Sequence, residues 1–368
     1  MVHINIDGQS VLVPQGVSIL EAAKSVGIDI PNFCYDKDLR VVGACRMCVV
    51  EIEGHRNLVT ACTTTVTEGM KIQTESEQVT EARKTLLDLL LANHPQDCMT
   101  CEKTGDCRLQ DYCYRYGVKA SSFQGERKQF EIDSNNHLIE RDQNKCILCG
   151  KCVRVCREVQ VTSAVDFVGR GFDTKVTTPL DSPLSMDCCR FCGQCVSICP
   201  TGALINKQLK GIRPWEVNKV RTTCPFCGTG CNFDLNVNDG KILGVTPNPE
   251  APVNGRSLCV KGRFHTDLIY SPDRITKPLI KRNGAFVEAG WDEALNLISA
   301  KFIEIKTRDG GDAIAALSSA RCTNEDNWVM QKFMRAVMLP PSFTRLPKKP
   351  ESITLWVLLS IPPVRLTS

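Results

Sequence analysis

The sequence predicts an α+β protein built from several small modules in series, each held together by bound metal. The main observation is the cysteine content, because the 368-residue chain contains 22 cysteines and only 5 histidines. These cysteines recur as Cys-x2-Cys pairs, which in a chain of this length indicates thiolate metal ligands rather than a disulfide framework. Aromatic residues make up only 6% of the sequence, which fits small metal-stapled modules better than one large core.

Charge and hydropathy exclude two kinds of partner. The formal net charge of +4 is too small to indicate binding to nucleic acid or to an anionic membrane. The sequence has no apolar run of about 18 residues, so we expect no membrane span. The N-terminus also lacks the basic stretch and apolar region of a signal peptide. We therefore expect a cytoplasmic protein whose thiols stay reduced and bind metal.

Residues 1–78 are expected to form a β-grasp module. Residues 2–13 alternate apolar and polar positions around Asp7-Gly8, which predicts a hairpin. Residues 18–28 predict a short helix that ends at a glycine. Two strands followed by a helix at the start of a cysteine-rich module favour the β-grasp arrangement.

The first cysteine set has the spacing of a 2Fe–2S site. Its members are Cys34, Cys45, Cys48 and Cys62. Such a cluster needs four thiolates, and a close Cys-x2-Cys pair with two distant cysteines supplies them. The alternatives are buried thiols or a zinc site. Zinc is less favoured, because four-ligand zinc sites usually pair two short cysteine elements.

The second set follows a predicted helix over residues 77–92, within an expected module of residues 79–118. Its members are His94, Cys98, Cys101 and Cys107. A histidine at the end of a helix is more often structural than a ligand. Here three cysteines lack a fourth nearby, which favours His94 as the fourth ligand of a 4Fe–4S cluster. One imidazole among three thiolates makes a cluster less anionic and alters its potential.

The third set predicts two 4Fe–4S clusters within residues 138–210. Each of two runs reads Cys-x2-Cys-x2-Cys-x3-Cys, as in bacterial two-cluster ferredoxins, where the fourth cysteine of each run serves the other cluster. One cluster is therefore assigned to Cys146, Cys149, Cys152 and Cys199. The other is assigned to Cys189, Cys192, Cys195 and Cys156. Cys188 could compete with Cys189, but only Cys189 keeps the spacing to Cys192.

The fourth set lies in an expected module of residues 220–275, which also carries a predicted hairpin over 232–245. Its members are Cys224, Cys227, Cys231 and Cys259. The spacing alone also suits zinc, but the neighbouring cluster motifs favour a further 4Fe–4S cluster. Two of the remaining cysteines, Cys113 and Cys322, are expected to be buried thiols.

Residues 276–337 are expected to begin an α/β layer. Residues 291–307 predict a helix, residues 312–319 a buried strand, and residues 323–337 a helix capped by Thr323. A strand between two helices is typical of a doubly wound sheet.

Residues 338–368 have a different character. They contain six prolines, no glycine and one acidic residue, which does not continue an α/β sheet. A disordered tail is one explanation. We favour a terminus created by truncation or a frameshift after Val337.

In order and spacing, these motifs resemble a known family. The motifs GACRMC, HPQDCMTC, CILCGKC and CGQCVSICPTGAL resemble the N-terminal region shared by the large iron–sulfur subunit of respiratory complex I, iron-only hydrogenases and NAD-linked formate dehydrogenases. The double ferredoxin run is characteristic of the last two. The motifs TTCPFCGTGC, SLCVKGRF and SSARCTNEDNWVMQKFMRAV resemble the entry to the molybdopterin domain of formate dehydrogenase alpha subunits. The resemblance covers residues 1–337.

This resemblance implies a function and its cofactors. The fourth cysteine set would hold a 4Fe–4S cluster beside a bis(molybdopterin guanine dinucleotide) centre with molybdenum or tungsten. Lys261 would lie between them as an electron relay, stabilising the reduced cluster and donating hydrogen bonds to the pterin. Formate would be oxidised to CO2, and electrons would pass along one 2Fe–2S and four 4Fe–4S clusters to a flavin- and NAD(P)-binding iron–sulfur subunit.

One departure leaves two alternatives open. In the family, the cysteine or selenocysteine that binds the metal lies beyond the FMRAV helix, and here no cysteine or histidine follows Cys322. We therefore expect this chain to carry the electron-transfer clusters of the enzyme without its catalytic centre. The first alternative is an electron-transfer protein without formate chemistry, which the absent ligand favours. The second is a complex I-type subunit, against which the paired ferredoxin runs count.

Overall fold

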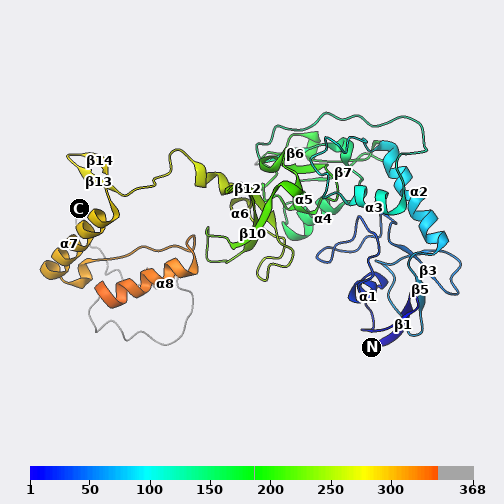
Figure 1. Cartoon of the computed structure of the whole chain (residues 1–368), viewed down its shortest axis with the longest axis horizontal. Helices are drawn as coiled ribbons and strands as arrows, with labels where there is room; N and C mark the ends of the chain where they lie inside the picture. The colour runs from blue at the N-terminus through cyan, green and yellow to red at the C-terminus, as the bar shows by residue number, and fades with distance from the viewer. Residues whose placement is uncertain (186, 339–368) are drawn as a thin grey trace. The chain divides into compact units, whose positions relative to one another are not determined.

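The structure is a computed structural model that describes residues 1–185 and 187–338 (Figure 1). The chain divides into two compact units. The first contains Met1–Val220, Leu235–Pro247 and Arg256–Phe264. The second contains Arg221–Asp234, Asn248–Gly255 and the chain from His265 onward. Apart from Met338, the proline-rich segment predicted for residues 338–368 lies outside the described residues.

The N-terminal module is a mixed five-stranded sheet in the order β2-β1-β5-β3-β4, crossed by one helix. Its elements are β1 (Val2–Ile6), β2 (Gln9–Val13), α1 (Ile19–Ser25), β3 (Val49–Ile52), β4 (Val59–Thr60) and β5 (Lys71–Gln73). Strand β1 pairs antiparallel with β2 and parallel with β5. Asp7 and Gly8 both have positive φ angles, as a two-residue hairpin turn requires. The predicted β-grasp arrangement is confirmed.

The core of this module follows directly from the alternation in its sequence. Inward positions of the two pairing strands, such as Ile6 and Ile72, are at most 1% exposed. Ile19 of α1 is completely buried against them, and Ser18 caps that helix by accepting a hydrogen bond from the Glu21 amide.

Two helices connect this module to the next cysteine set. They are α2 (Glu77–Asn93), which matches the predicted helix, and α3 (Arg108–Tyr116). Their apolar faces bury Leu87 and Leu109 together with Phe33 and Met47 from the loops of the first module. The second set of ligand candidates therefore lies on segments that share a core with the first.

Arg83 of α2 joins the helix to the sheet. Its side chain has no exposed surface. The guanidinium donates hydrogen bonds to the carbonyls of Met47 and Val49, at 3.2 and 2.8 Å, and to the Tyr116 hydroxyl at 2.7 Å. It also forms an ion pair with Glu75 at 2.8 Å. All three guanidinium nitrogens therefore have partners, as a buried charge requires.

The third module has short elements separated by cysteine-rich loops. They are β6 (Ile139–Arg141), α4 (Lys151–Arg154), β7 (Asp166–Val168), β8 (Lys175–Thr177), α5 (Gln194–Ile198) and β9 (Leu204–Asn206). Strand β6 pairs with β9, and β7 pairs with β8, both antiparallel. One helix lies within each cysteine run, before its fourth cysteine, so the module has two corresponding halves.

A three-stranded sheet in the order β10-β11-β12 follows. Its strands are β10 (Asn218–Thr223), β11 (Asn232–Asn238) and β12 (Lys241–Pro247), and α6 (Val260–Phe264) follows them in sequence. The predicted hairpin around Asp239-Gly240 is confirmed, with positive φ angles at both residues. Helix α6 packs against β12 (Figure 1).

The rest of the second unit is mostly helical. Its elements are β13 (Leu279–Arg282), β14 (Ala285–Glu288), α7 (Trp291–Asp309) and α8 (Asn324–Phe333). Both predicted helices are confirmed. Thr323 caps α8 reciprocally with Asp326, whose amide donates to the Thr323 hydroxyl at 3.1 Å.

The strand predicted at residues 312–319 is wrong. The chain forms a short 3-10 turn at Gly311–Ala313 and then runs to the next turn without strand pairing in the described residues. Leu317 is 81% exposed, although its apolar neighbours suggested burial. A buried parallel strand needs neighbouring strands on both sides, and the described part of the chain supplies none here.

Helices α2 and α7 are the longest in the described residues. Neither these nor any other described helix is both long enough and apolar enough to cross a lipid bilayer.

Candidate iron–sulfur centres

The structure brings the first cysteine set together beside the β-grasp core. Cys34, Cys48 and Cys62 are at most 2% exposed. Hydrogen bonds link Cys34 to Cys45 and Cys48 to Cys62. The bond from Cys45 lowers the pKa of the Cys34 thiol to about 5, while Cys45 and Cys62 have raised pKa values as the donors of these pairs. Four clustered thiols, two of which (Cys34 and Cys48) have lowered pKa values, fit the donor set of a 2Fe–2S cluster.

Gly43 shapes the loop that carries this set. Its φ is +60°, and a Cβ atom there would lie 2.9 Å from the Thr63 side chain. Both facts require glycine, which lets the backbone of this loop turn closely around the cysteine set.

The three cysteines of the second set also lie near one another. Cys101 and Cys107 are each 8% exposed, whereas Cys98 is exposed. Burial raises the pKa values of both Cys98 and Cys107, and the nearby Cys101 adds to each shift. Cys113, predicted to be a buried thiol, lies close enough to Cys107 and Cys98 to feel their charges, but burial is what raises its pKa to about 12.

His94 caps α2 and is 9% exposed. Burial lowers its pKa to about 4, so the ring is neutral at physiological pH, which is the form that binds metal. Its Nδ1 atom is buried and has no hydrogen-bond partner among residues 1–185 and 187–338. A neutral, buried imidazole with an unused nitrogen fits a metal ligand, although the side chains that act on its pKa are Asp97, Lys145 and Asp142 rather than the three cysteines.

This burial predicts a pH-dependent stability for the iron-free chain. As the pH falls, the unfolded chain protonates His94 at its ordinary pKa of 6.5, before the folded chain does near 4. The His94 contribution should therefore be constant above pH 6.5 and fall by about 3 kcal/mol between pH 6.5 and 4. Urea unfolding of the wild-type and His94→Gln chains across this range measures the difference. Identical pH slopes in the two chains would contradict the prediction.

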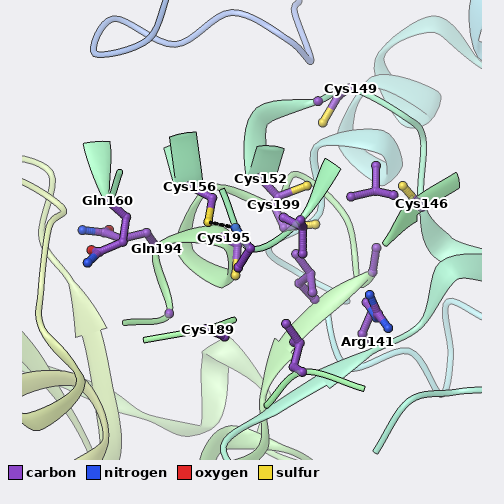
Figure 2. Close-up of a pocket in the computed structure, with 18 of the residues that line it drawn as sticks. Arg141, Cys146, Cys149, Cys152, Cys156, Gln160, Cys189, Gln194, Cys195 and Cys199 are labelled. Carbon is purple, nitrogen blue, oxygen red and sulfur yellow. Dashed lines mark hydrogen bonds between the residues drawn. The ribbon is translucent and has the colours of Figure 1, made fainter. Parts of the chain in front are cut away.

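All eight cysteines of the third set line one cavity (Figure 2). The lining is mostly apolar and includes Val165, Val176 and Leu184. Burial raises the pKa of Cys146 to about 12 and of Cys189 to about 11, so a bound cationic metal centre is needed to keep these groups as thiolates. A mostly apolar cavity lined by eight thiols fits two iron–sulfur clusters.

The two runs hold their first cysteines in the same way. The Leu148 amide donates to the Cys146 sulfur at 3.4 Å, and the Phe191 amide donates to the Cys189 sulfur at 3.3 Å. Leu148 and Phe191 have positive φ angles of 52° and 49°. This strained conformation aims each amide at the sulfur, a hydrogen bond that favours the thiolate.

The fourth cysteine of each run lies with the first three cysteines of the other run. The charge of Cys199 acts on Cys146, Cys149 and Cys152. In the other half of the cavity, the charge of Cys156 acts on Cys189, Cys192 and Cys195. Figure 2 shows Cys199 beside Cys152, and Cys156 beside Cys195.

Sequence reasoning missed one buried and one partly buried cation beside these sets. Arg154 donates to the carbonyls of Cys34 and Arg40, the latter at 2.6 Å, and so joins the first and third sets. Lys145 precedes Cys146 and forms ion pairs with Asp97 and Asp142 at 3.2 and 3.5 Å. Their only signal in the sequence was their position beside cluster cysteines.

The fourth set is divided between the two units. Three of its members, Cys224, Cys227 and Cys231, lie in the second unit, and Cys259 lies in the first, so the set as a whole stays a prediction. The Cys224 amide donates to the Cys231 carbonyl at 2.7 Å, which closes the loop. Lys261 lies in α6, two residues after Cys259.

Within the described residues, no three His, Cys, Asp or Glu side chains converge closely enough to hold a single metal ion. The fit to iron–sulfur clusters rests instead on the grouped thiols of the first and third sets. A β-grasp module with four clustered thiols and a second module with eight around one cavity define an iron–sulfur electron-transfer protein.

Comparison with known families narrows this class. Residues 1–77 match a 2Fe–2S iron–sulfur cluster binding domain, and residues 83–122 match the NADH-ubiquinone oxidoreductase-G iron–sulfur binding region. Residues 136–205 match the ferredoxin-like domain of NADH-quinone oxidoreductase subunit 3. Residues 217–271 match the molybdopterin oxidoreductase Fe4S4 domain, and residues 274–346 match molybdopterin oxidoreductase itself.

Curated relatives agree with these matches. The chain is 40% identical over 339 residues to the NADPH-Fe(3+) oxidoreductase subunit alpha of Geobacter sulfurreducens, covering 92% of this chain and 39% of the relative. It is also 40% identical over 341 residues to the G 2 subunit of the NADH-quinone oxidoreductase of Rhizobium meliloti, covering 92% of this chain and 39% of the relative. A putative formate dehydrogenase of Staphylococcus aureus is 31% identical over 375 residues, with 91% of this chain and 38% of the relative covered.

A solved structure shares the fold of part of the chain. It is an NAD⁺-reducing [NiFe]-hydrogenase in the H2-reduced state, with a TM-score of 0.52 and 32% identity, covering 58% of this chain and 90% of that chain. In its iron–sulfur and molybdopterin oxidoreductase domains, the chain is similar to NADH-quinone oxidoreductase G-like subunits. It spans about two fifths of the length of the curated relatives it matches. The expected oxidoreductase family is confirmed, whereas the expected formate specificity has support only from the relatives at 31% identity.

Proposed function

We propose that this chain forms the iron–sulfur electron-transfer portion of a molybdopterin oxidoreductase that exchanges electrons with NAD(P) through a flavin-binding partner subunit. The observation that carries the proposal is the single cavity lined by eight cysteines from two runs. The module order, from a 2Fe–2S domain to a molybdopterin domain, supports an electron path between two ends. We further propose that formate is the substrate of this oxidoreductase and CO2 its product.

The proposed ligands follow the four sets. A 2Fe–2S cluster would be held by Cys34, Cys45, Cys48 and Cys62. Four 4Fe–4S clusters would be held by His94, Cys98, Cys101 and Cys107; by Cys146, Cys149, Cys152 and Cys199; by Cys189, Cys192, Cys195 and Cys156; and by Cys224, Cys227, Cys231 and Cys259. Proposed module bounds are 1–78, 79–118, 138–210, 220–275 and 276–337.

Bound clusters would supply reversible one-electron transfer, and the protein would tune it. Buried apolar walls around the third set exclude water, and backbone amides donate to the sulfurs of Cys146 and Cys189. Buried cations such as Arg154 offset the negative charge of the thiolates. Lys261 is proposed to lie between the last cluster and a bis(molybdopterin guanine dinucleotide) cofactor with molybdenum or tungsten, as an electron relay.

The proposed partner is a flavin- and NAD(P)-binding iron–sulfur subunit. Support comes from the relatives, whose names include NADH, NADPH and NAD⁺-reducing enzymes. A cytoplasmic location is part of the same proposal. The second candidate function is that of a complex I-type subunit without formate chemistry, which the 40% identity to an NADH-quinone oxidoreductase subunit favours.

Metal analysis and a formate assay distinguish these functions. The anaerobically purified chain should contain iron sufficient for one 2Fe–2S and four 4Fe–4S clusters. Formate-dependent reduction of a dye by a preparation that contains molybdenum or tungsten would support the formate function. Iron without either heavy metal, and no dye reduction with formate, would contradict that function for this chain and leave the second candidate. Absence of iron would contradict both.

A further inference from the structure

Arg263 is a buried cation in the helix that follows Cys259. It belongs to α6 and is only 2% exposed. Its Nε donates to the Cys192 carbonyl at 2.7 Å, and Nη1 donates to the hydroxyl of Ser197 in α5. Its Nη2 is buried and has no acceptor. The guanidinium therefore lies against the second cysteine run, with one donor group unused.

The second run leaves space for this side chain at Gly193. A Cβ atom at that position would lie 2.7 Å from Nε of Arg263 and 3.0 Å from the ring of Phe264. Gly193 also has a φ of +69°, which disfavours any other residue. The backbone between Cys192 and Cys195 is thus shaped to receive an arginine from a segment about 70 residues later in the chain.

In the part of the chain that the structure describes, no carboxylate pairs with Arg263. Among the described residues, the groups whose charges raise its pKa are three cysteines: Cys192, Cys195 and Cys259. Burial lowers that pKa to about 10, so the side chain stays charged at neutral pH. A buried charge without a counter-charge is strongly unfavourable.

We propose that Arg263 is the counterion of the 4Fe–4S cluster assigned to Cys156, Cys189, Cys192 and Cys195, and that its fixed charge raises the reduction potential of that cluster. Adding an electron makes a cluster more negative, so a nearby buried cation stabilises the reduced form more than the oxidised form. Arg263 is therefore a positioning and tuning residue rather than a ligand. The inference rests on the proposed function, because it requires this cluster.

A redox titration of the purified full-length chain, followed by electron paramagnetic resonance, tests the proposal. Arg263→Met should lower the equilibrium constant for reduction of one 4Fe–4S cluster at least tenfold. For a one-electron couple, this corresponds to a potential lower by at least 59 mV. Arg263→Lys keeps the charge and should shift that couple by less than half as much. Arg190→Met is the matched control, because Arg190 adjoins Cys189 and borders the same cavity but is exposed, so water screens its charge.

Each outcome decides the proposal. An iron-loaded Arg263→Met chain whose potentials match those of Arg190→Met would overturn it. If the Arg263→Met chain does not load iron, the Arg263→Lys chain is the deciding variant. Full iron loading of Arg263→Lys would show that the cluster needs the positive charge. Equal loss of iron in both variants would show a purely structural role and overturn the proposal. A wild-type chain without 4Fe–4S signals would contradict the proposed function instead.

Discussion

Replacing Cys146 and Cys199 together with alanine should remove one 4Fe–4S cluster, whereas replacing Cys189 and Cys199 together should remove two. The reason is the crossed arrangement of the two runs. Cys199 acts electrostatically on Cys146, Cys149 and Cys152, although it follows Cys189 in sequence. Two changes in one ligand set damage one cluster, and changes in both sets damage both. Iron per chain and the integrated 4Fe–4S resonance signal measure the loss.

The two double variants control for each other, since each lacks two cysteines and each carries the Cys199 change. General misfolding would lower iron content equally in both. If the Cys146/Cys199 variant loses two clusters and the Cys189/Cys199 variant loses one, the ligands are not crossed, and each run holds its own cluster.

Replacing Arg83 with methionine should destabilise the N-terminal half of the chain by about 3 kcal/mol. The change leaves the carbonyls of Met47 and Val49 without their donor inside the protein. Glu75 contributes less to this loss, because its side chain is 42% exposed and can be solvated. The Met47 carbonyl lies next to Cys48, so the variant should also lose its 2Fe–2S cluster more readily. Urea midpoints from circular dichroism under anaerobic conditions measure the difference.

Arg115 provides a matched control for Arg83. It pairs with the same Glu75 at 2.6 Å, and its guanidinium lies 5.5 Å from the centre of the Tyr116 ring, against 5.8 Å for Arg83. Its side chain is 37% exposed, so Arg115→Met should cost less than about 1 kcal/mol. Equal destabilisation by the two variants would show that the shared contacts, and not burial of the Arg83 hydrogen bonds, carry the stability.

Elements with a strong local pattern were predictable from the sequence. The hairpin at Asp7-Gly8, the helix from Glu77 and the Thr323 cap all depend on residues within a few positions of one another. The strand at residues 312–319 was wrong because apolar composition shows only that a segment favours burial. Whether it becomes a strand depends on neighbouring strands, which no local pattern contains.

In the candidate centres, too, the sequence predicted the features that depend on local spacing and missed those that depend on distant contacts. Cysteine spacing identified the four thiols around Cys34 and the eight around one cavity, since metal ligands recur at characteristic intervals. The buried arginines could not be found in this way. Arg154 and Arg263 look like ordinary surface residues in the sequence, and their burial depends on contacts 120 and 71 positions away.

The loop that carries Cys34 has a consequence for how the protein is made. Arg154 holds the Cys34 carbonyl, and Arg256 forms ion pairs with Asp36 and Asp38 at the other end of the loop, the second at 2.7 Å. Translation produces the β-grasp sheet well before Arg154 and Arg256. The loop that carries Cys34 therefore gains these two contacts only after more than 100 further residues have been synthesised.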